Sequence, residues 1–240
     1  MGIDYSVTFN RSARVDEAIQ ILNSVSHDCK NGRLLDLGCG NGDTTKCFFM
    51  KGVDVVGLEV NPIPYIHVPF VRASGLKLPF KDGYFNTVIL NDVLEHVRYV
   101  DAVQLFNEIS RVLTVNGFLY VSVASKFEFR EPHSNKLFLS WLPRFIYAPV
   151  IRGFLGEDVY PYTVRQFRGL TEESNFTFDN FTGFYVAKKV ADLSYVGNTI
   201  LRPLIGLMVK LKLTGSAGLL RCLEPFGVLV FVCKKTGVCR

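Results

Sequence analysis

The sequence predicts an α/β fold: a doubly wound, mostly parallel sheet of seven strands, with helices on both faces. Short strands that are apolar throughout alternate with helical segments along the chain of 240 residues, and strands buried on both sides are typical of parallel sheets. A glycine-rich turn directly follows the first strand, and Glu59 ends the second. Such sheets bind ligands at the carboxyl ends of their strands, so these two features also predict where a site lies.

Apolar spacing and turn residues define the individual elements. Apolar residues recur at helical intervals between positions 14 and 26, which predicts a leading helix there. Gly52 is suited to end the second helix and Thr163 to cap the last one. The predicted strands are 33–37, 53–58, 70–71, 88–90, 118–123, 176–181 and 227–234, and the predicted later helices are 44–51, 100–113 and 163–174.

Length and composition fit one folded domain. With 48% hydrophobic residues, the chain can bury a large core. We expect a single domain over 1–240, with an aromatic-rich lid insertion at 126–162 that holds four prolines, and a helical insertion at 190–224. Six cysteines without paired spacing, and no signal-peptide pattern, predict a reduced, cytoplasmic compartment.

Charge and one apolar stretch raise the question of a membrane. The stretch 196–223 is strongly apolar, but Arg202 and Lys210 interrupt it, whereas a spanning helix needs about 20 mainly apolar residues. We expect it to pack over the sheet edge or to lie in a membrane surface.

The charge is distributed unevenly along the chain. Residues 126–240 hold 16 basic and 9 acidic residues, against 11 basic and 13 acidic residues in 1–125. The basic half suits an anionic substrate or a peripheral membrane contact, and ordinary solvated charge explains it equally well.

The glycine-rich turn predicts the class of ligand. Residues 34–42 read Leu-Leu-Asp-Leu-Gly-Cys-Gly-Asn-Gly, and backbone without Cβ atoms can approach a ligand closely. A dinucleotide-binding turn needs a glycine five residues after Gly38, but Asp43 stands there and would repel a pyrophosphate. Glu59 can accept hydrogen bonds from both hydroxyls of a ribose. A phosphate-free nucleoside with a zwitterionic tail, S-adenosyl-L-methionine, fits both observations.

This turn resembles the first motif of the class I, Rossmann-like S-adenosylmethionine-dependent methyltransferases. Three further segments follow in the order of that family: Val55-Val56-Gly-Leu-Glu59, then Leu78-Pro-Phe80 with Tyr84-Phe85, then Val88-Ile-Leu-Asn-Asp-Val-Leu-Glu-His-Val97. The resemblance covers about the first half of the chain. It implies an enzyme that transfers a methyl group from S-adenosyl-L-methionine.

The resemblance also implies which residues contact the cofactor. The glycine turn would hold its methionine part, Glu59 the ribose, and the loop after the third strand the adenine. The expected cofactor-binding residues are Asp36, Gly38, Cys39, Gly40, Asn41, Gly42, Glu59, Val60, Ser74, Gly75, Leu76, Asn91 and Asp92. Ser74 stands where the family often has an Asp that reads the adenine amino group, and Asn86 replaces an Asp that often opens the fourth strand. Both departures change residues that the family uses around the adenine, so the adenine contacts are expected to differ from those of the family.

Two histidines are the candidate catalytic residues. Methyl transfer mainly needs alignment and exclusion of water, and it needs a base only where the acceptor must lose a proton, as a hydroxyl must. His96 and His133 could each take that proton near neutral pH, and each could equally be structural; Asp92 is a further candidate. Asp92, Glu95 and His96 share one helical face and could hold a divalent ion. A capping and packing group is the simpler interpretation, so no metal is predicted.

The aromatic run 137–143, Leu-Phe-Leu-Ser-Trp-Leu-Pro, resembles the lid of methyltransferases from surface-glycan and lipid-linked sugar pathways. It predicts O-methylation of a small-molecule, sugar or lipid-linked glycan acceptor, although a hydrophobic lid core explains at least half of these rings.

Methylation of nucleic acid or protein is an alternative function. Against it, Asn91-Asp92 stands where base-amine methylation uses Asn-Pro-Pro-Tyr, and no nucleic-acid partner is expected. A non-catalytic subunit that binds the cofactor, or nothing, is the third alternative.

Overall fold

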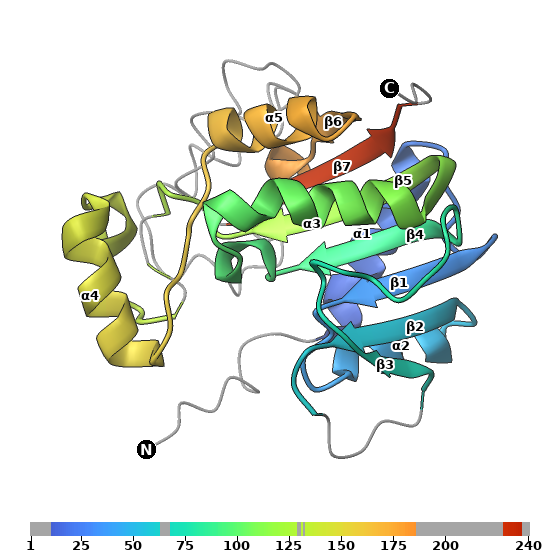
Figure 1. The fold of residues 1–240 in the computed structure, drawn as a ribbon, viewed down its shortest axis with the longest axis horizontal. Helices are drawn as coiled ribbons and strands as arrows, with labels where there is room; N and C mark the ends of the chain where they lie inside the picture. Colours follow the sequence, from blue (N-terminus) through green and yellow to red (C-terminus); the bar gives the residue numbers. More distant parts are fainter. Residues whose placement is uncertain (1–10, 63–67, 129–130, 132, 186–227, 237–240) are drawn as a thin grey trace.

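A computed structural model describes residues 11–62, 68–128, 131, 133–185 and 228–236, and these residues form one seven-stranded sheet (Figure 1). The strand order is β3-β2-β1-β4-β5-β7-β6. The strands are β1 (Arg33–Leu37), β2 (Asp54–Glu59), β3 (Phe70–Arg72), β4 (Phe85–Asn91), β5 (Leu113–Val123), β6 (Phe176–Asn180) and β7 (Leu229–Lys235). All seven predicted strands are present, with ends that differ by a few residues.

The sheet is mixed, because one strand runs against the others. The pairs that join β1, β2, β3, β4 and β5 are all parallel. β7 lies between β5 and β6 and is antiparallel to both. The α/β fold with a mostly parallel sheet is confirmed, and β7 is the departure from a wholly parallel one.

The strand order places the ligand-binding end of the sheet. The chain moves outward from β1 to β2 and β3 and then crosses to β4, on the other side of β1. Ligands of doubly wound sheets bind outside the carboxyl ends of the strands at the point where the order reverses. The ends of β1 and β4 therefore mark the expected site.

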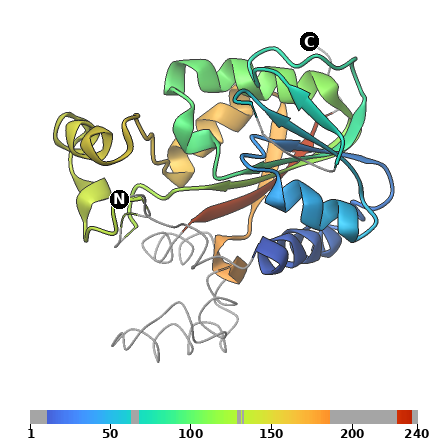
Figure 2. The same cartoon turned by 90° about the horizontal axis from the view of Figure 1, so that it is seen from below.

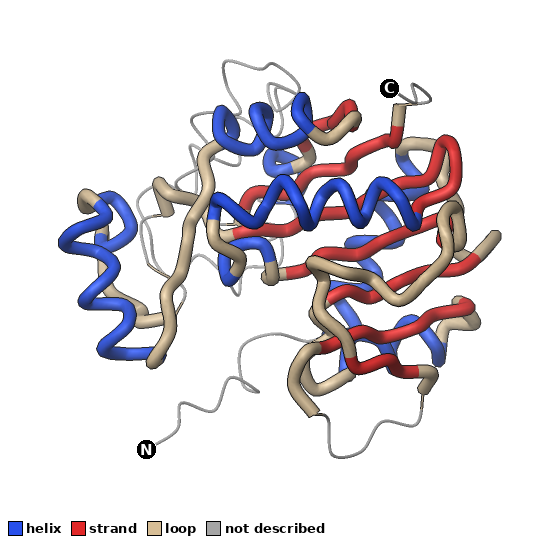
Figure 3. Tube along the Cα trace, viewed as in Figure 1, coloured by secondary structure: helices blue, strands red, loops and turns tan. Residues whose placement is uncertain are grey.

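Helices cover both faces of this sheet (Figures 2 and 3). α1 (Arg11–Ser24) and α2 (Asp43–Met50) lie on one face, and α3 (Tyr99–Val112) and α5 (Val164–Glu173) on the other. Successive strand side chains point to opposite faces, so Leu34 packs with α1 and α2 while Leu35 packs with α3 and α5. The four helices match the predicted ones, and Thr163 caps α5 as expected.

Residues 126–162, which we call the protruding segment, leave the sheet and return to it at one place. Ser125 and Tyr162 form a parallel bridge at the end of β5, and the Lys126 amide donates to the Tyr162 carbonyl at 2.8 Å. Between these ends the chain forms a 3-10 helix, η3 (Leu139–Trp141), and α4 (Arg144–Leu155). In Figure 1, α4 stands away from the sheet, beyond the carboxyl ends of its strands.

The sequence did not predict α4, because Pro149 lies inside it and an interior proline disfavours a helix. A small separate core holds α4 in place; it consists of Leu139, Tyr147, Ile151 and Val159.

No helix in the described part of the chain has the length and apolar character needed to cross a membrane. The predicted helical insertion at 190–224, with its apolar stretch 196–223, lies outside the described residues.

Candidate active site

The glycine turn, residues 38–42, joins β1 to α2 in a backbone conformation that favours glycine. The φ angles are +75° at Gly38, +57° at Gly40 and +81° at Gly42, where a side chain brings strain. The amides of the first two turn residues donate to the Leu58 carbonyl, at 2.8 and 3.1 Å. The turn is therefore tied to the end of β2.

Two of these glycines have different surroundings. A Cβ on Gly38 would lie 2.4 Å from Cγ2 of Val93, so this glycine lets the segment after β4 pack against the turn. A Cβ on Gly40 would have no heavy atom within 4 Å. The backbone of Gly40 therefore faces open space, which a ligand can fill at close range.

Glu59 is fixed beside this open backbone. Its Oε2 accepts a hydrogen bond from the Gly40 amide at 3.2 Å. Its Oε1 accepts from the amides of Val60, at 2.8 Å, and Asn61, at 3.2 Å. Since each carboxylate oxygen can accept more than one hydrogen bond, Glu59 retains capacity for ligand hydroxyls. Val60 is exposed next to it.

The side chains of Asp36 and Cys39 point into the protein. Asp36 is 2% exposed and accepts a hydrogen bond from Oγ1 of Thr45 at 2.6 Å. Burial raises the pKa of this carboxyl to about 6, although the hydrogen bond from Thr45 acts to lower it. Burial likewise raises the pKa of the Cys39 thiol to about 12. Both side chains hold the turn in position and are inaccessible at the surface.

The N-terminus of α2 already has a negatively charged partner. Asp43 is the first residue of α2, and Nδ2 of Asn41 donates to its carboxylate at 2.7 Å. Helix N-termini attract anions, and here a carboxylate of the chain itself takes that place. The arrangement agrees with a ligand that brings no phosphate to this turn.

The loop after β3 uses its polar groups to hold its own shape. Oγ of Ser74 accepts from the Leu76 amide at 3.2 Å, and the Leu76 carbonyl accepts from Nε2 of Gln104 at 2.9 Å. Gly75 packs closely on Leu105, since a Cβ would lie 3.0 Å from its Cδ1. The backbone of this loop is thus set by contacts with α3.

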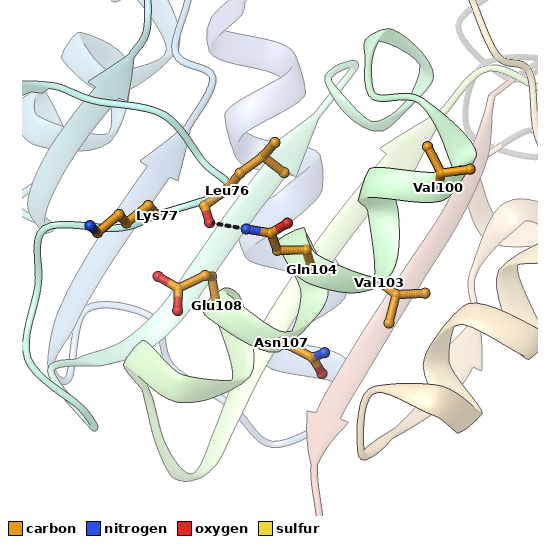
Figure 4. Close-up of a pocket in the computed structure, with 7 residues that line it drawn as sticks. All are labelled: Leu76, Lys77, Val100, Val103, Gln104, Asn107 and Glu108. Carbon is orange, nitrogen blue, oxygen red and sulfur yellow. Dashed lines mark hydrogen bonds between the residues drawn. The ribbon is translucent and has the colours of Figure 1, made fainter.

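A hollow of about 520 Å³ lies between this loop and the outer side of α3 (Figure 4). It is lined by Leu76, Lys77, Val100, Val103, Gln104, Asn107 and Glu108. Leu76 is the one predicted cofactor-binding residue that lines it, and neither the glycine turn nor Glu59 contributes to it.

Asn91 and Asp92 form a polar network at the end of β4. Oγ of Ser122 lies 2.5 Å from Oδ1 of Asn91 and 3.0 Å from Oδ1 of Asp92. Oδ2 of Asp92 pairs with Nη2 of Arg14 at 2.6 Å. Burial disfavours the charged guanidinium of Arg14, but the charge and hydrogen bond of Asp92 together with Tyr185 and Tyr120 outweigh burial, and the pKa of Arg14 is raised. The Asp92 carboxylate is thus engaged by Arg14 and Ser122.

The two predicted catalytic histidines, far apart in sequence, lie side by side. The ring centroids of His96 and His133 are 5.5 Å apart, with one ring edge-on to the other. His96 ends the 3-10 helix η2 (Leu94–His96), and its amide donates to the carbonyl of Val93 at 2.9 Å. Val93 is the residue that packs against Gly38. The histidine pair therefore stands next to the glycine turn.

Glu131 holds His133 in one orientation. Nδ1 of His133 is 2.8 Å from Oε1 of Glu131, and Oε2 of Glu131 accepts from the Ser134 amide at 2.6 Å. Burial would raise the pKa of Glu131, but its hydrogen bonds with His133 and Ser134 outweigh burial and lower it. Because an ionised carboxylate only accepts hydrogen bonds, Nδ1 of His133 carries the proton that faces Glu131.

His96 has a more exposed partner. Its Nδ1 lies 3.3 Å from Oε1 of Glu157, whose side chain is 60% exposed. Burial lowers the pKa of His96; Glu157 opposes this shift and His133 adds to it. The His96 imidazole is therefore neutral at pH 7.

The side chains of Asp92, Glu95 and His96 do not converge as a metal site would require. Asp92 binds Arg14, and His96 faces Glu157. Glu95 is 2% exposed, and burial together with the charge of Asp92 raises its pKa well above the ordinary value. Among the residues that the structure describes, no three His, Cys, Asp or Glu side chains are arranged to hold a metal ion.

Sequence reasoning missed Glu131 and Arg14. Glu131 stands two residues before His133, a spacing at which a carboxylate can reach an imidazole, and this was the available signal. Arg14 carries no comparable signal, because its contact with Asp92 depends on how α1 packs. The sequence predicts Tyr147 as one of the rings that contact a sugar or a lipid chain, but it is 2% exposed on α4, where burial and the charge of Glu131 raise the pKa of its phenol.

The region that carries this site matches a known family. Residues 35–121 match the methyltransferase domain family. The matched region begins in β1, contains the glycine turn, Glu59 and His96, and ends in β5. His133 and the rest of the protruding segment lie beyond it.

Curated relatives match the same part of the chain. An uncharacterized protein of Methanocaldococcus jannaschii is 36% identical over 113 residues, which are 46% of this chain and 48% of that protein. An uncharacterized methyltransferase of Mycobacterium sp. (strain KMS) is 35% identical over 96 residues, 37% of each chain. The chain spans about half or less of the length of these relatives. Their likeness concerns the methyltransferase domain and says nothing of the acceptor.

Solved structures share the fold over nearly the whole chain. The 1,6-didemethyltoxoflavin-N1-methyltransferase of Burkholderia thailandensis, with bound 1,6-didemethyltoxoflavin and S-adenosylhomocysteine, has a TM-score of 0.57 at 16% identity. The alignment covers 97% of this chain and 81% of that one. At this identity the likeness shows the fold. Together with the domain match, it supports the prediction of a class I methyltransferase.

Proposed function

We propose that this chain is an S-adenosylmethionine-dependent methyltransferase that methylates a hydroxyl group of a small-molecule, sugar or lipid-linked acceptor. One observation carries the cofactor assignment: the backbone of Gly40 faces open space, and the Glu59 carboxylate is fixed beside it at 3.2 Å from the Gly40 amide. When bound, the cofactor supplies an activated methyl group, whose bond to sulfur breaks as the bond to the acceptor oxygen forms.

The residues around Gly40 fit a nucleoside without phosphate. The bare backbone leaves room for the ligand, and Glu59 accepts hydrogen bonds from the ribose hydroxyls. Asp43 occupies the helix N-terminus, where a phosphate would otherwise bind. The exposed side chains of Asn41 and Val60 border the same place.

His133 is the stronger of the two candidates for the general base. Glu131 fixes its Nδ1–H, so Nε2 can take the proton that the acceptor hydroxyl loses. The ionised Glu131 then stabilises the imidazolium that forms, as a buried carboxylate does in other carboxylate–histidine pairs. His96 is the second candidate: it is neutral and adjacent, but its carboxylate partner is exposed.

Exposed aromatic rings support a sugar or lipid-linked acceptor. Phe127 and Phe138 both contact Trp141 edge-on, with centroids 6.0 and 5.4 Å away. All three rings are partly open to solvent. Such rings can stack on a sugar or contact a lipid chain, and they belong to the protruding segment that also carries His133.

A calorimetric titration with S-adenosylmethionine tests the cofactor assignment, with Gly40→Val and Gly52→Val as matched variants. Both glycines have positive φ, +57° and +80°, and a Cβ at either would meet no heavy atom within 4 Å. Valine therefore strains both positions alike, but only position 40 lies in the proposed site. We expect Gly40→Val to lose measurable binding and Gly52→Val to keep it.

The absence of heat from folded wild-type protein at saturating ligand would refute the assignment and favour a non-catalytic subunit. Retained affinity in Gly40→Val would refute the placement of the ligand. For the acceptor, mass spectrometry of glycans and lipids from a deletion strain should reveal a species lighter by one methyl group. A methyl group missing from nucleic acid or protein instead would redirect the proposal to that substrate class.

A further inference from the structure

The outer side of the protruding segment exposes large apolar side chains at high density. More than half of the exposed large apolar residues in the described part of the chain lie in this segment. We call six of them, which are between 37% and 78% exposed, the apolar surface: Leu137, Phe138, Trp141, Leu142, Phe145 and Ile146. Many large exposed apolar side chains within ten residues of sequence are typical of an interaction site.

Most of the exposed charges in the protruding segment are basic. Lys136, Arg144 and Arg152 are exposed. The acidic residues between positions 126 and 156 are Glu128 and Glu131, and both are buried. Glu157 follows with a side chain that is 60% exposed, and it faces His96.

Apolar and basic side chains share one face of α4. A shallow hollow on that face is lined by Arg144, Phe145, Ala148, Pro149 and Arg152. Asp158 pairs with Arg152 at 2.7 Å and offsets its charge. The guanidinium of Arg144 lies 4.0 Å from the ring centroid of Tyr160, which leaves its charge in place. Lys136 and Arg144 thus provide the positive charge beside the apolar surface.

We propose that the apolar surface docks on a membrane that contains anionic lipids. Trp, Phe, Leu and Ile side chains bordered by Lys and Arg are suited to the interface of a bilayer, where the apolar groups enter the acyl-chain boundary and the cations meet lipid phosphates. α4 stands away from the sheet (Figure 1), so a flat bilayer can approach it. The proposal uses no cofactor-binding residue. It shares Phe138 and Trp141 with the proposed acceptor contact, and vesicle binding is measured without cofactor or methyl transfer, so the two proposals can fail separately.

Two other occupants fit this surface less well. A second copy of the chain, related by a two-fold axis, would place Lys136 and Arg144 of both copies in one interface, where like charges repel. Nucleic acid is bound through many phosphate contacts and through stacking rings. Aliphatic side chains such as Leu137 and Ile146 cannot stack on bases, and the basic groups here are few.

Trp141 makes the proposal directly testable, because it is the only tryptophan in the chain and lies in the apolar surface. The full chain is mixed with vesicles of phosphatidylcholine alone, or of phosphatidylcholine with phosphatidylglycerol. We expect Trp141 emission to move to shorter wavelength, and the protein to sediment, with the anionic vesicles. High salt should weaken both effects.

Phe145→Glu and Met50→Glu form a matched pair, since these side chains are 78% and 76% exposed and Met50 lies on α2, far from the segment in sequence. We expect Phe145→Glu to lower the affinity for anionic vesicles about tenfold or more, and Met50→Glu to leave it unchanged. Arg144→Gln should lower it about fivefold, the effect of one basic residue near a charged bilayer. Circular dichroism establishes that each variant is folded.

Three results would overturn the proposal. The first is folded wild-type protein that neither sediments with anionic vesicles nor changes its emission. The second is an equal loss in Phe145→Glu and Met50→Glu. The third is a Trp141 shift that needs no vesicles and follows protein concentration, together with a dimer in sedimentation velocity, which would assign the surface to a second copy of the chain.

Discussion

The glycine turn and the protruding segment meet at the same end of the sheet, but they are built differently. The turn is held by hydrogen bonds to the neighbouring strand β2, and β1, which leads into it, packs in two large cores. The described residues of the segment form a separate core of four buried side chains, and the segment returns to the sheet at Tyr162, next to where it leaves. Regions with few buried contacts open more easily than the rest of a fold. The proposed function assigns cofactor binding to the glycine turn and acceptor recognition to the protruding segment.

The histidine pair joins these two regions. His96 lies in the region that matches the methyltransferase domain family, and His133 belongs to the protruding segment. A general base at His133 therefore requires the segment to be docked, whereas cofactor binding at the turn does not. Changes in the segment should affect turnover, and changes in the turn should affect cofactor affinity.

The largest effect on the segment side is expected from His133→Asn. Removal of a general base lowers turnover by about 10²- to 10⁴-fold, while the affinity for S-adenosylmethionine stays unchanged because the turn is intact. Glu131→Gln should also lower turnover and shift its pH profile, since an amide no longer stabilises the protonated imidazole. Transfer of a labelled methyl group measures turnover, and calorimetry measures cofactor affinity.

His96→Asn is the matched control, because the two rings are in contact. If only His96→Asn loses turnover, the general base is His96 and not His133. A fall in cofactor affinity in His133→Asn would contradict the separation of the two regions.

On the side of the turn, Asp36 should make stability depend on pH. The folded-state pKa of this buried carboxyl is about 6, above its ordinary value of about 3.9 in an unfolded chain. Between these values the unfolded chain has lost the proton and the folded chain keeps it. The free energy of unfolding should therefore fall by roughly 2–3 kcal/mol as the pH rises from about 4 to about 6.

Asp36→Asn removes this titration and keeps an oxygen that can accept the Thr45 hydrogen bond. Its free energy of unfolding should lack the decline seen in the wild type over the same pH range, as measured by chemical denaturation. A decline of the same size in the variant would assign the pH dependence to other groups.

The two regions also differ in how much of their structure the sequence predicts. The glycine turn was predicted together with Glu59 and Asp43. A short turn takes its conformation from its own residues, and here from glycines, which have no side chain. α4 was not predicted, because Pro149 argues against a helix that packing of Tyr147 and Ile151 nevertheless stabilises.

The site shows the same difference. His96 and His133 were each predicted as a candidate, but neither their contact nor the role of Glu131 could be read from the sequence, since both depend on how the protruding segment folds back. The reversal of β7 likewise follows from the path of the chain through space and leaves no mark on local periodicity.

A smaller effect is expected at Glu59. Glu59→Ala should weaken cofactor binding by about 1–3 kcal/mol, because the ribose hydroxyls lose a charged acceptor. The Gly40 amide loses its acceptor as well. Glu59→Gln keeps an acceptor oxygen and should retain part of the affinity. Calorimetry distinguishes the variants, and an unchanged affinity in Glu59→Ala would remove this residue from the site.

The smallest effect concerns the joint between the two regions. Thr163 directly follows the end of the protruding segment and caps α5: its Oγ1 accepts from the Gln166 amide at 3.2 Å, and Oε1 of Gln166 accepts from the Thr163 amide at 3.0 Å. Thr163→Ala should lower the free energy of unfolding by about 1 kcal/mol, measured by urea denaturation. Cofactor affinity should stay unchanged, because α5 makes none of the contacts that hold the glycine turn. A parallel loss of cofactor affinity would show that the glycine turn depends on this joint, and that the two regions are a single cooperative unit.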